Sequence, residues 1–262
     1  MKPLIARIEG IGWWSNGLPS WADACAFARG GRAPEAAPAR PSPQLLAANE
    51  RRRAPESVAV ALEVALAACT MAGRDPAALP SVFASTHGDL GITDYMSATL
   101  AGDDPASISP TRFHNSVHNA AAGYWTIGAG CMQPATALSA YDASFAQGLL
   151  EALVQLATGS TAVLLAAYDT GASGPLEAIA DTRGTLGGAL VLAAGDGDGH
   201  RLHAWLEDGT ADAAIGPLGE REAGNAMHPM LPLFDALAHA HPAALALHAG
   251  AGRVLRLDIA PA

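Results

Sequence analysis

The chain has 262 residues, of which 50% are hydrophobic and 15% charged, and its formal net charge at neutral pH is −10. This share of apolar residues is typical of a chain with a buried core and excludes disorder over most of the length. The length suits one large or two small domains. The acidic balance, with no basic stripe to neutralise phosphates, excludes nucleic-acid binding as the main function.

The three cysteines, Cys25, Cys69 and Cys131, are widely spaced and form no paired framework, which is typical of a reducing compartment. The first residues lack the long apolar segment of a signal peptide. No uninterrupted apolar run is long enough to span a bilayer. We therefore expect a cytoplasmic location and no membrane partner.

The first part of the chain alternates between strand-like and helical segments. Residues 4–14 have the pattern of a strand, and the Pro-, Ala- and Gly-rich residues 30–43 indicate a loop. The charge run at 49–53 is most simply a solvated helix start or loop, and a binding patch is the alternative. Residues 55–71 predict a buried helix, because a proline opens the segment and a glycine follows it.

A short strand and a polar-capped helix are expected next. Residues 81–86 predict a buried strand that ends in a glycine-containing turn. A helix is expected over 93–101, capped by Thr93 or Asp94, since such side chains accept hydrogen bonds from free backbone N–H groups. Residues 102–110 are expected to form a loop.

The last part of the chain consists of apolar runs separated by glycine-rich turns. Residues 189–194 predict a buried strand, and the turn at 195–200 predicts a hairpin with an antiparallel strand over 201–207. Three further segments are a loop, a helix and a strand–turn–strand unit, at 208–225, 232–239 and 243–260. Helices mixed with buried strands, without internal repeats, predict a layered α/β fold.

The central stretch, residues 110–169, contains a sharp junction at Ser139–Asp142, followed by an apolar helix and a buried strand. Enzymes of the α/β class often place a nucleophile at such a junction, because the helix N-terminus offers free N–H groups and a partial positive charge. A cysteine here would be activated, but the junction has none. The candidates are Tyr141, Asp142 and Ser144, and the simplest role for Asp142 is a helix N-cap.

Histidines cluster loosely in two parts of the chain. His114 and His118 are four residues apart, a spacing that would place both on one helix face, but no third ligand stands at a suitable offset. We interpret them, with nearby His87, as structural or interface residues and expect no metal. A C-terminal group at 239, 241 and 248 lacks the flanking pattern of a catalytic motif.

The central stretch resembles the N-terminal half of the β-ketoacyl synthases, the thiolase-fold condensing enzymes of fatty acid and polyketide synthesis. The resemblance covers residues 55–195 well and the remainder weakly. It is carried by the run Asn-Ser-Val-His-Asn-Ala-Ala-Ala-Gly at 115–123 and by flanking positions, namely Pro110, Trp125–Ile127, Gly130, Pro134, the glycine-rich turn after residue 86, Gly187–Ala194 and the hairpin at 244–257.

The resemblance implies a nucleophile position that this chain does not fill with cysteine. When Pro134 is aligned with the family proline, residues 140–142 fall on the family's Thr-Ala-Cys motif, with Asp142 at the nucleophile position. An offset of one residue would place Tyr141 there. The two histidines that the family's C-terminal half contributes to decarboxylation and oxyanion stabilisation also have no matching motif.

With these departures the chain resembles the chain length factors. Those proteins are ketosynthase homologues that lack the nucleophile and pair with an active ketosynthase. Short proteins of this type occur in aryl polyene clusters. The resemblance implies one domain over 1–262, a thiolase-like α/β/α/β/α fold with a complete N-terminal half and a shortened C-terminal part at 196–262. It implies no cofactor, a heterodimer with an active β-ketoacyl synthase, and an acyl carrier protein engaged indirectly, through that partner.

The same resemblance suggests which residues shape an acyl pocket or interface, namely Met96, Leu100, Phe113, His118 and Met132. Two other functions stay open. One is an independent enzyme of this fold that uses Asp142, Tyr141 or a nearby histidine for hydrolysis or acyl transfer. The other is a homodimeric acyl-binding protein.

Overall fold

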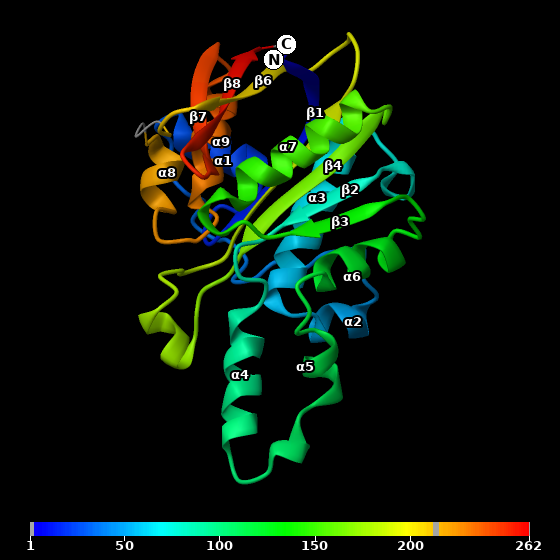
Figure 1. The fold of residues 1–262 in the computed structure, drawn as a ribbon, viewed down its shortest axis with the longest axis vertical. Helices are drawn as coiled ribbons and strands as arrows, with labels where there is room; N and C mark the ends of the chain where they lie inside the picture. Colours follow the sequence, from blue (N-terminus) through cyan, green and yellow to red (C-terminus); the bar gives the residue numbers. More distant parts are fainter. Residues whose placement is uncertain (1–2, 212–214, 262) are drawn as a thin grey trace.

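The computed structural model describes residues 3–211 and 215–261. Within these ranges the chain folds into one sheet of eight strands, in the order β3-β2-β4-β5-β1-β6-β8-β7 (Figure 1). The pairs β2–β3 and β2–β4 are parallel, and the pairs from β4 to β7 along the sheet are antiparallel. The strands are β1 Leu4–Ser15, β2 Ser81–Ala84, β3 Ala135–Leu138, β4 Ala162–Asp169, β5 Leu186–Ala193, β6 His200–Asp208, β7 Ala243–Gly250 and β8 Arg253–Ala260.

The helices form two layers around this sheet. Helices α3 and α6 pack with one face of β2, β4 and β5, and α7 and α9 lie with the other face and also contact β7. The helices are α1 Trp21–Ala28, α2 Ala48–Arg53, α3 Glu56–Ala72, α4 Leu90–Ala101, α5 Pro110–His114, α6 Ala120–Gly128, α7 Ser144–Ala157, α8 Pro217–Arg221 and α9 Leu231–His239. Helices α4 and α5 form an arm that projects from the body (Figure 1).

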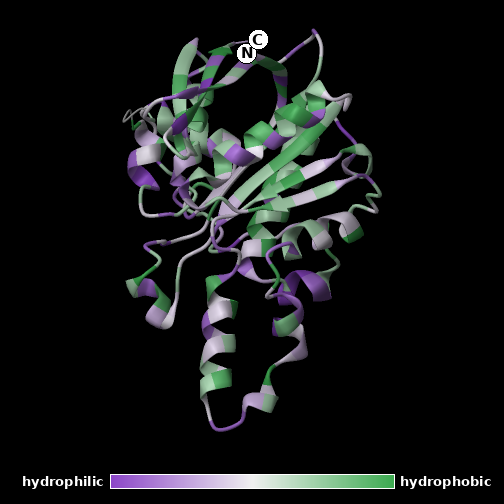
Figure 2. Cartoon of the chain, viewed as in Figure 1, coloured by the Kyte–Doolittle hydropathy of each residue, from purple (hydrophilic) through white to green (hydrophobic). Residues whose placement is uncertain are grey.

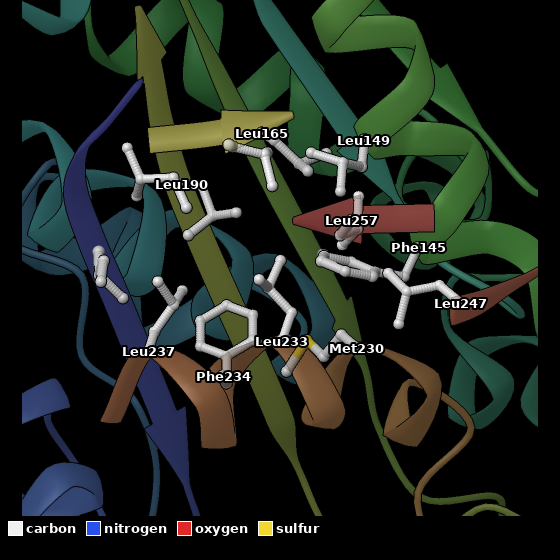
Figure 3. Packing of buried hydrophobic residues seen from close by; sticks show 14 of the residues in the cluster. Phe145, Leu149, Leu165, Leu190, Met230, Leu233, Phe234, Leu237, Leu247 and Leu257 are labelled. Carbon is white, nitrogen blue, oxygen red and sulfur yellow. The ribbon is translucent and has the colours of Figure 1, made fainter. Parts of the chain in front are cut away.

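The core between α7, α9 and the strands is built from large apolar side chains of distant segments. Phe145 and Leu149 on α7 meet Phe234 on α9 and Leu165 and Leu190 on the strands (Figure 3). The rings of Phe145 and Phe234 lie 6.3 Å apart in a tilted arrangement. Each fully buried side chain of this kind contributes roughly 1.5–3 kcal/mol, so α7 is held firmly against the sheet.

Glycine allows α3 to lie directly on β1. A Cβ atom at Gly12 would overlap the carbonyl oxygen of Val64, and one at Gly10 would overlap that of Ala68. The helix is buried on nearly all sides, as its sequence predicts, and it ends at Gly73 in the left-handed conformation (φ 62°). The close approach of helix and strand therefore fixes the layer that supports the first half of the sheet.

The outer face of the last strands is polar and open. Arg201, His203 and Asp258 point away from the core and are exposed, while Leu202 and Leu257 are buried on the opposite face. A strand covered on both faces would be apolar on both. The outer face of β6 and β8 therefore carries no helical layer within the described residues. The layered α/β fold that the sequence predicts is present in the rest of the sheet.

Most predicted elements are found close to their expected bounds, including β1, α3, β2, α7, β4, α9 and the C-terminal hairpin. The predicted pairing of residues 189–194 with 201–207 is wrong. Strand β1 lies between β5 and β6 and pairs with both, so the turn at 195–200 joins two strands that are not neighbours. Turn chemistry alone does not reveal a third strand that comes from the other end of the chain.

Helix α4 begins three residues before its predicted start. Its N-cap is Asp89, whose Oδ1 accepts a hydrogen bond of 2.8 Å from the backbone N–H of Ile92. Thr93 lies inside the first turn and donates its hydroxyl to the Asp89 carbonyl at 3.0 Å. The predicted caps Thr93 and Asp94 are therefore wrong, because an acceptor placed earlier takes the first free N–H. The predicted loops at 102–110 and 208–225 also contain short helical turns, of which α8 is the longest.

Polarity follows this architecture. In Figure 2 the central strands and α7 are largely hydrophobic, and the arginine-rich α2 is hydrophilic. Arg52 and Arg53 are exposed, in agreement with a solvated helix. No helix among the described residues is long and apolar enough to cross a membrane.

Candidate functional site

The junction expected at residues 139–142 is a tight turn between β3 and α7. Tyr141 has a positive φ of 54°, one of only three such non-glycine residues in the described chain. Ser144 stabilises the turn, because its Oγ accepts from the N–H of Ala140 at 2.9 Å and donates to the carbonyl of Tyr141 at 2.6 Å. Unusual backbone conformations of this kind cluster at functional sites. The structure thus makes Tyr141 the apex of the turn and leaves its side chain 69% exposed.

Asp142 does not cap the helix. The residue before α7 is Ala143, and no side chain caps it. The Oδ1 atom of Asp142 instead lies 3.4 Å from Nε2 of His248 on β7, with the two side chains 58% and 39% exposed. The predicted N-cap role is therefore wrong, because Asp142 lies within the turn that precedes the helix, one residue before the N-cap position.

His248 is the functional candidate that the sequence did not single out. It belongs to the hairpin β7–β8, about a hundred residues downstream of the junction. A second contact joins this hairpin to α7, since Nε2 of Gln147 donates a hydrogen bond of 2.6 Å to the carbonyl of Ala249. The sequence offered one signal for this role of His248, namely its place in a glycine-rich hairpin that resembles the family. The residues around it lack the motif of a catalytic histidine.

A buried carboxylate organises the loop on the other side of the turn. Asp169, at the end of β4, is fully buried and accepts hydrogen bonds from Ser85 Oγ at 2.8 Å, Thr86 N at 2.8 Å and His87 N at 3.1 Å. Burial raises the pKa of this carboxyl, and the hydrogen bonds act in the opposite direction. Asp169 therefore fixes residues 85–87 beside the junction.

This loop contacts the junction directly. Thr86 donates its hydroxyl to the carbonyl of Tyr141 at 3.2 Å, and Ser139 donates its own to the carbonyl of Thr86 at 2.9 Å. The ring of His87 lies 6.4 Å from that of Tyr141, edge to face. The turn is thus held from the β2 side through backbone and hydroxyl contacts, and none of these groups is a thiol.

His114 and His118 do not lie on one helix. His114 ends α5, and His118 lies beyond it with Nε2 at 2.9 Å from the carbonyl of Ser85. No group of three or more metal-binding side chains occurs within residues 3–211 and 215–261. A carbonyl only accepts, so His118 Nε2 carries a proton and serves to hold the same loop.

None of the cysteines is near the turn. Cys25 is half-buried on α1, whereas Cys69 on α3 and Cys131 before β3 are buried. Burial raises the pKa of Cys69 to about 12 and also raises that of Cys25. A thiol with such a pKa is almost fully protonated at neutral pH and is a poor nucleophile.

The proposed pocket and interface residues are spread along the arm and the edge of the sheet. Met96 on α4 and His118 are half-buried, whereas Leu100, Phe113 and Met132 are 57%, 63% and 95% exposed. Strand β3 beside them is an edge strand that pairs with β2 alone. The structure does not gather these side chains into one cavity with Asp142.

Asp142 and His248 instead border a pocket of about 370 Å³ between the junction, α9 and β7. Its remaining walls come mainly from small and apolar residues, with His228 and Asp235 as the other polar side chains, and include Ile215, Pro229, Leu231, Pro232, Ala246 and Leu247. The arrangement offers a carboxylate and imidazoles but no activated sulfur, so it can bind and transfer protons and lacks a thioester-forming group.

Comparison with known proteins assigns the family of the chain. The sequence profile of the beta-ketoacyl synthase N-terminal domain matches residues 21–254. The chain belongs to this family. No curated protein gives a significant match to the sequence.

Solved structures of ketosynthase complexes are similar to this β-ketoacyl synthase domain. One is the ketosynthase ApeO in complex with its chain length factor ApeC from Xenorhabdus doucetiae, with a TM-score of 0.75, 22% identity and coverage of 97% of this chain and 99% of that chain. Another is the ishigamide ketosynthase/chain length factor, with a TM-score of 0.73, 15% identity and 99% coverage of both chains. At these identities the similarity establishes the thiolase-like fold.

Proposed function

We propose that this chain is the non-catalytic partner subunit of an active β-ketoacyl synthase and acts as a chain length factor. The observation that carries the proposal is the junction itself. A member of the family has Ala140, Tyr141 and Asp142 where a cysteine is expected, and all its cysteines lie elsewhere. An enzyme without the acyl-accepting thiolate depends on another chain for condensation.

Exposed apolar side chains of residues 100–141 support a partner. Six large apolar side chains with more than half of their surface exposed fall between residues 100 and 141, namely Leu100, Phe113, Val117, Ile127, Met132 and Tyr141. Large apolar side chains that are this exposed are typical of surfaces that a partner covers. The edge strand β3 adds unpaired backbone groups that another strand could satisfy.

Similar solved structures favour the same reading. Two of them are named as complexes of a ketosynthase with a chain length factor, and a third, with 10% identity and a TM-score of 0.74, as an acyl carrier protein in complex with its type II polyketide ketosynthase. By analogy, the active subunit would carry out condensation and engage the acyl carrier protein. We further propose a polyketide or aryl polyene pathway and a cytoplasmic location.

Co-expression with any ketosynthase encoded beside this gene tests the proposal. We expect a stable one-to-one complex by size-exclusion chromatography with light scattering. The variant Phe113→Asp should weaken the complex, whereas Ile5→Asp, a matched exposed residue at the start of β1, should not. A chain that stays monomeric or homodimeric with every neighbouring ketosynthase contradicts the proposal.

The independent-enzyme alternative has its own observation, the contact between Asp142 and His248. Purified chain that turns over an acyl thioester, with loss of turnover in Asp142→Ala, would favour that function. A homodimer that binds acyl chains without turnover would favour the third.

A further inference from the structure

The pocket beside Asp142 presents side-chain hydrogen-bond acceptors. The Nδ1 atom of His228 lies 3.0 Å from the carbonyl oxygen of Asn225. Because a carbonyl only accepts, this nitrogen carries the proton and Nε2 of the neutral ring is left with a lone pair. The tautomer of His228 is therefore set by its backbone partner, and the ring offers an acceptor.

The same argument applies to the pair at the junction. His248 places Nε2 3.4 Å from a carboxylate oxygen of Asp142, and a carboxylate accepts, so a proton on Nε2 suits this contact and leaves Nδ1 of the neutral ring as an acceptor. The second carboxylate oxygen of Asp142 is also a hydrogen-bond acceptor. The side chains of His228, His248 and Asp142, each with an acceptor atom, border one pocket.

The charge of the pocket is negative. Asp235 adds a second carboxylate, whose two oxygens accept the backbone N–H groups of Leu218 and Gly219, each at 3.0 Å. Among the described residues of the lining there is no lysine or arginine. The whole chain carries a formal charge of −10, so the wider field has the same sign.

The remaining wall is apolar. Leu231, Leu247, Pro229 and Ile215 supply carbon surface, and the volume of about 370 Å³ is at the small end of the range for ligand pockets. Such a wall favours an apolar body, and the acceptors favour a donor head group. The two requirements together define a narrow chemical class.

We propose that this pocket binds a small organic cation, namely a primary ammonium group on an apolar body about the size of a phenylethyl group. An ammonium group has three N–H donors and no acceptor, which suits a pocket whose polar side chains offer acceptors. Its positive charge is attracted by Asp142 and Asp235, while a carboxylate ligand is repelled by both. A neutral alcohol donates a single hydrogen bond and gains no charge attraction.

This binding site does not depend on the partner-subunit function, since it concerns the chain alone. The test is isothermal titration and protein-observed NMR of the full chain at low salt, with 2-phenylethylamine, 2-phenylethanol and 3-phenylpropanoate. The amine should bind about tenfold more tightly than the alcohol, and the carboxylate should not bind measurably. Shifted resonances should belong to the lining of the pocket.

Variants test whether the amine binds in this pocket. Asp142→Asn should weaken amine binding about fivefold or more and leave alcohol binding nearly unchanged, because it removes the charge and keeps the shape. His228→Phe should weaken the amine by removing an acceptor, and His241→Ala, an exposed histidine outside the lining, should have no effect. Equal binding of amine and alcohol, tighter binding of the carboxylate, or no binding of any probe would overturn the proposal.

Discussion

The Oδ1 atom of Asp142 lies 3.4 Å from Nε2 of His248, and this contact joins the start of α7 to the C-terminal hairpin. The hairpin is also tied to α7 by the bond from Gln147 to the carbonyl of Ala249. A Cβ atom at Gly250 would lie 3.8 Å from that of Ala143, so the backbone itself passes close to the turn. The C-terminal hairpin therefore packs beside the turn that precedes α7.

The contact of Asp142 with His248 should contribute little to stability. Both side chains are more than one-third exposed, and even a fully charged pair so exposed contributes only about 0–1 kcal/mol. Asp142→Asn and His248→Gln should each lower the free energy of unfolding by no more than about 1 kcal/mol in urea denaturation. A much larger loss from both variants would mean that the contact is structural.

Asp169 should contribute far more to the free energy of unfolding than the contact of Asp142 with His248. Asp169→Ala leaves the donors Ser85 Oγ, Thr86 N and His87 N without their partner, and an unsatisfied buried donor costs about 1–3 kcal/mol. We expect a loss of several kcal/mol in denaturant unfolding and faster amide exchange at 86 and 87. Asp181→Ala, which changes a largely exposed carboxylate, is the matched control and should have almost no effect.

The pH dependence of that loss has a defined sign. Burial raises the pKa of Asp169, so the stabilisation linked to its proton is fully present below the ordinary aspartate pKa and is lost as pH rises through the raised value. The difference in unfolding free energy between wild type and Asp169→Ala should therefore shrink as pH rises from about 4. A difference that grows with pH would show that the folded-state pKa is lowered.

The sequence predicted those parts of the fold that depend on local pattern. The segments that became α3, β4 and α9 follow from apolar runs with proline and glycine at their ends. The insertion of β1 between β5 and β6 was not predictable, since it joins segments nearly two hundred residues apart and leaves no local trace. Pairing of distant strands is a property of the whole sheet.

The candidate site was predictable in the same uneven way. The missing cysteine and the turn at Tyr141 follow from the aligned motif, and local chemistry suggested a cap at Asp142. The expected N-cap at Asp142 is not found, and its carboxylate instead contacts His248. This contact was not predictable, because only the folded hairpin brings the imidazole to the carboxylate. Residues whose partners lie in the same segment were predictable, and those whose partners come from the other end of the chain were not.

Gly12 should tolerate no larger side chain. Because a Cβ atom there meets the backbone of Val64, Gly12→Val forces α3 away from β1 and opens the core between them. We expect a loss of several kcal/mol or insoluble protein on expression. Gly123→Ala is the matched control, since a Cβ at that helical position meets no atom within 4 Å and alanine favours helix. A stable Gly12→Val protein would contradict the packing described here.

The cysteines should resist alkylation. The pKa of Cys69 is raised to about 12 by burial, so iodoacetamide at neutral pH finds almost no thiolate there. In a complex with an active ketosynthase, mass spectrometry should find rapid labelling on the partner's nucleophile and little on Cys69 of this chain. Denaturation in urea before labelling is the control and should expose all three cysteines. Rapid labelling of native Cys69 would show that α3 opens readily.

Met96 offers a test of the acyl-pocket assignment. The side chain is half-buried on α4, in the arm that carries Leu100, and α5 with Phe113 packs beside it. If these residues border the end of an acyl tunnel shared with the ketosynthase, Met96→Trp fills part of that space and the complex should release shorter products. Met71→Trp, at an exposed methionine near the end of α3, is the matched control and should leave product length unchanged. Mass spectrometry of the products decides, and unchanged length in Met96→Trp, with the complex intact, removes Met96 from the pocket.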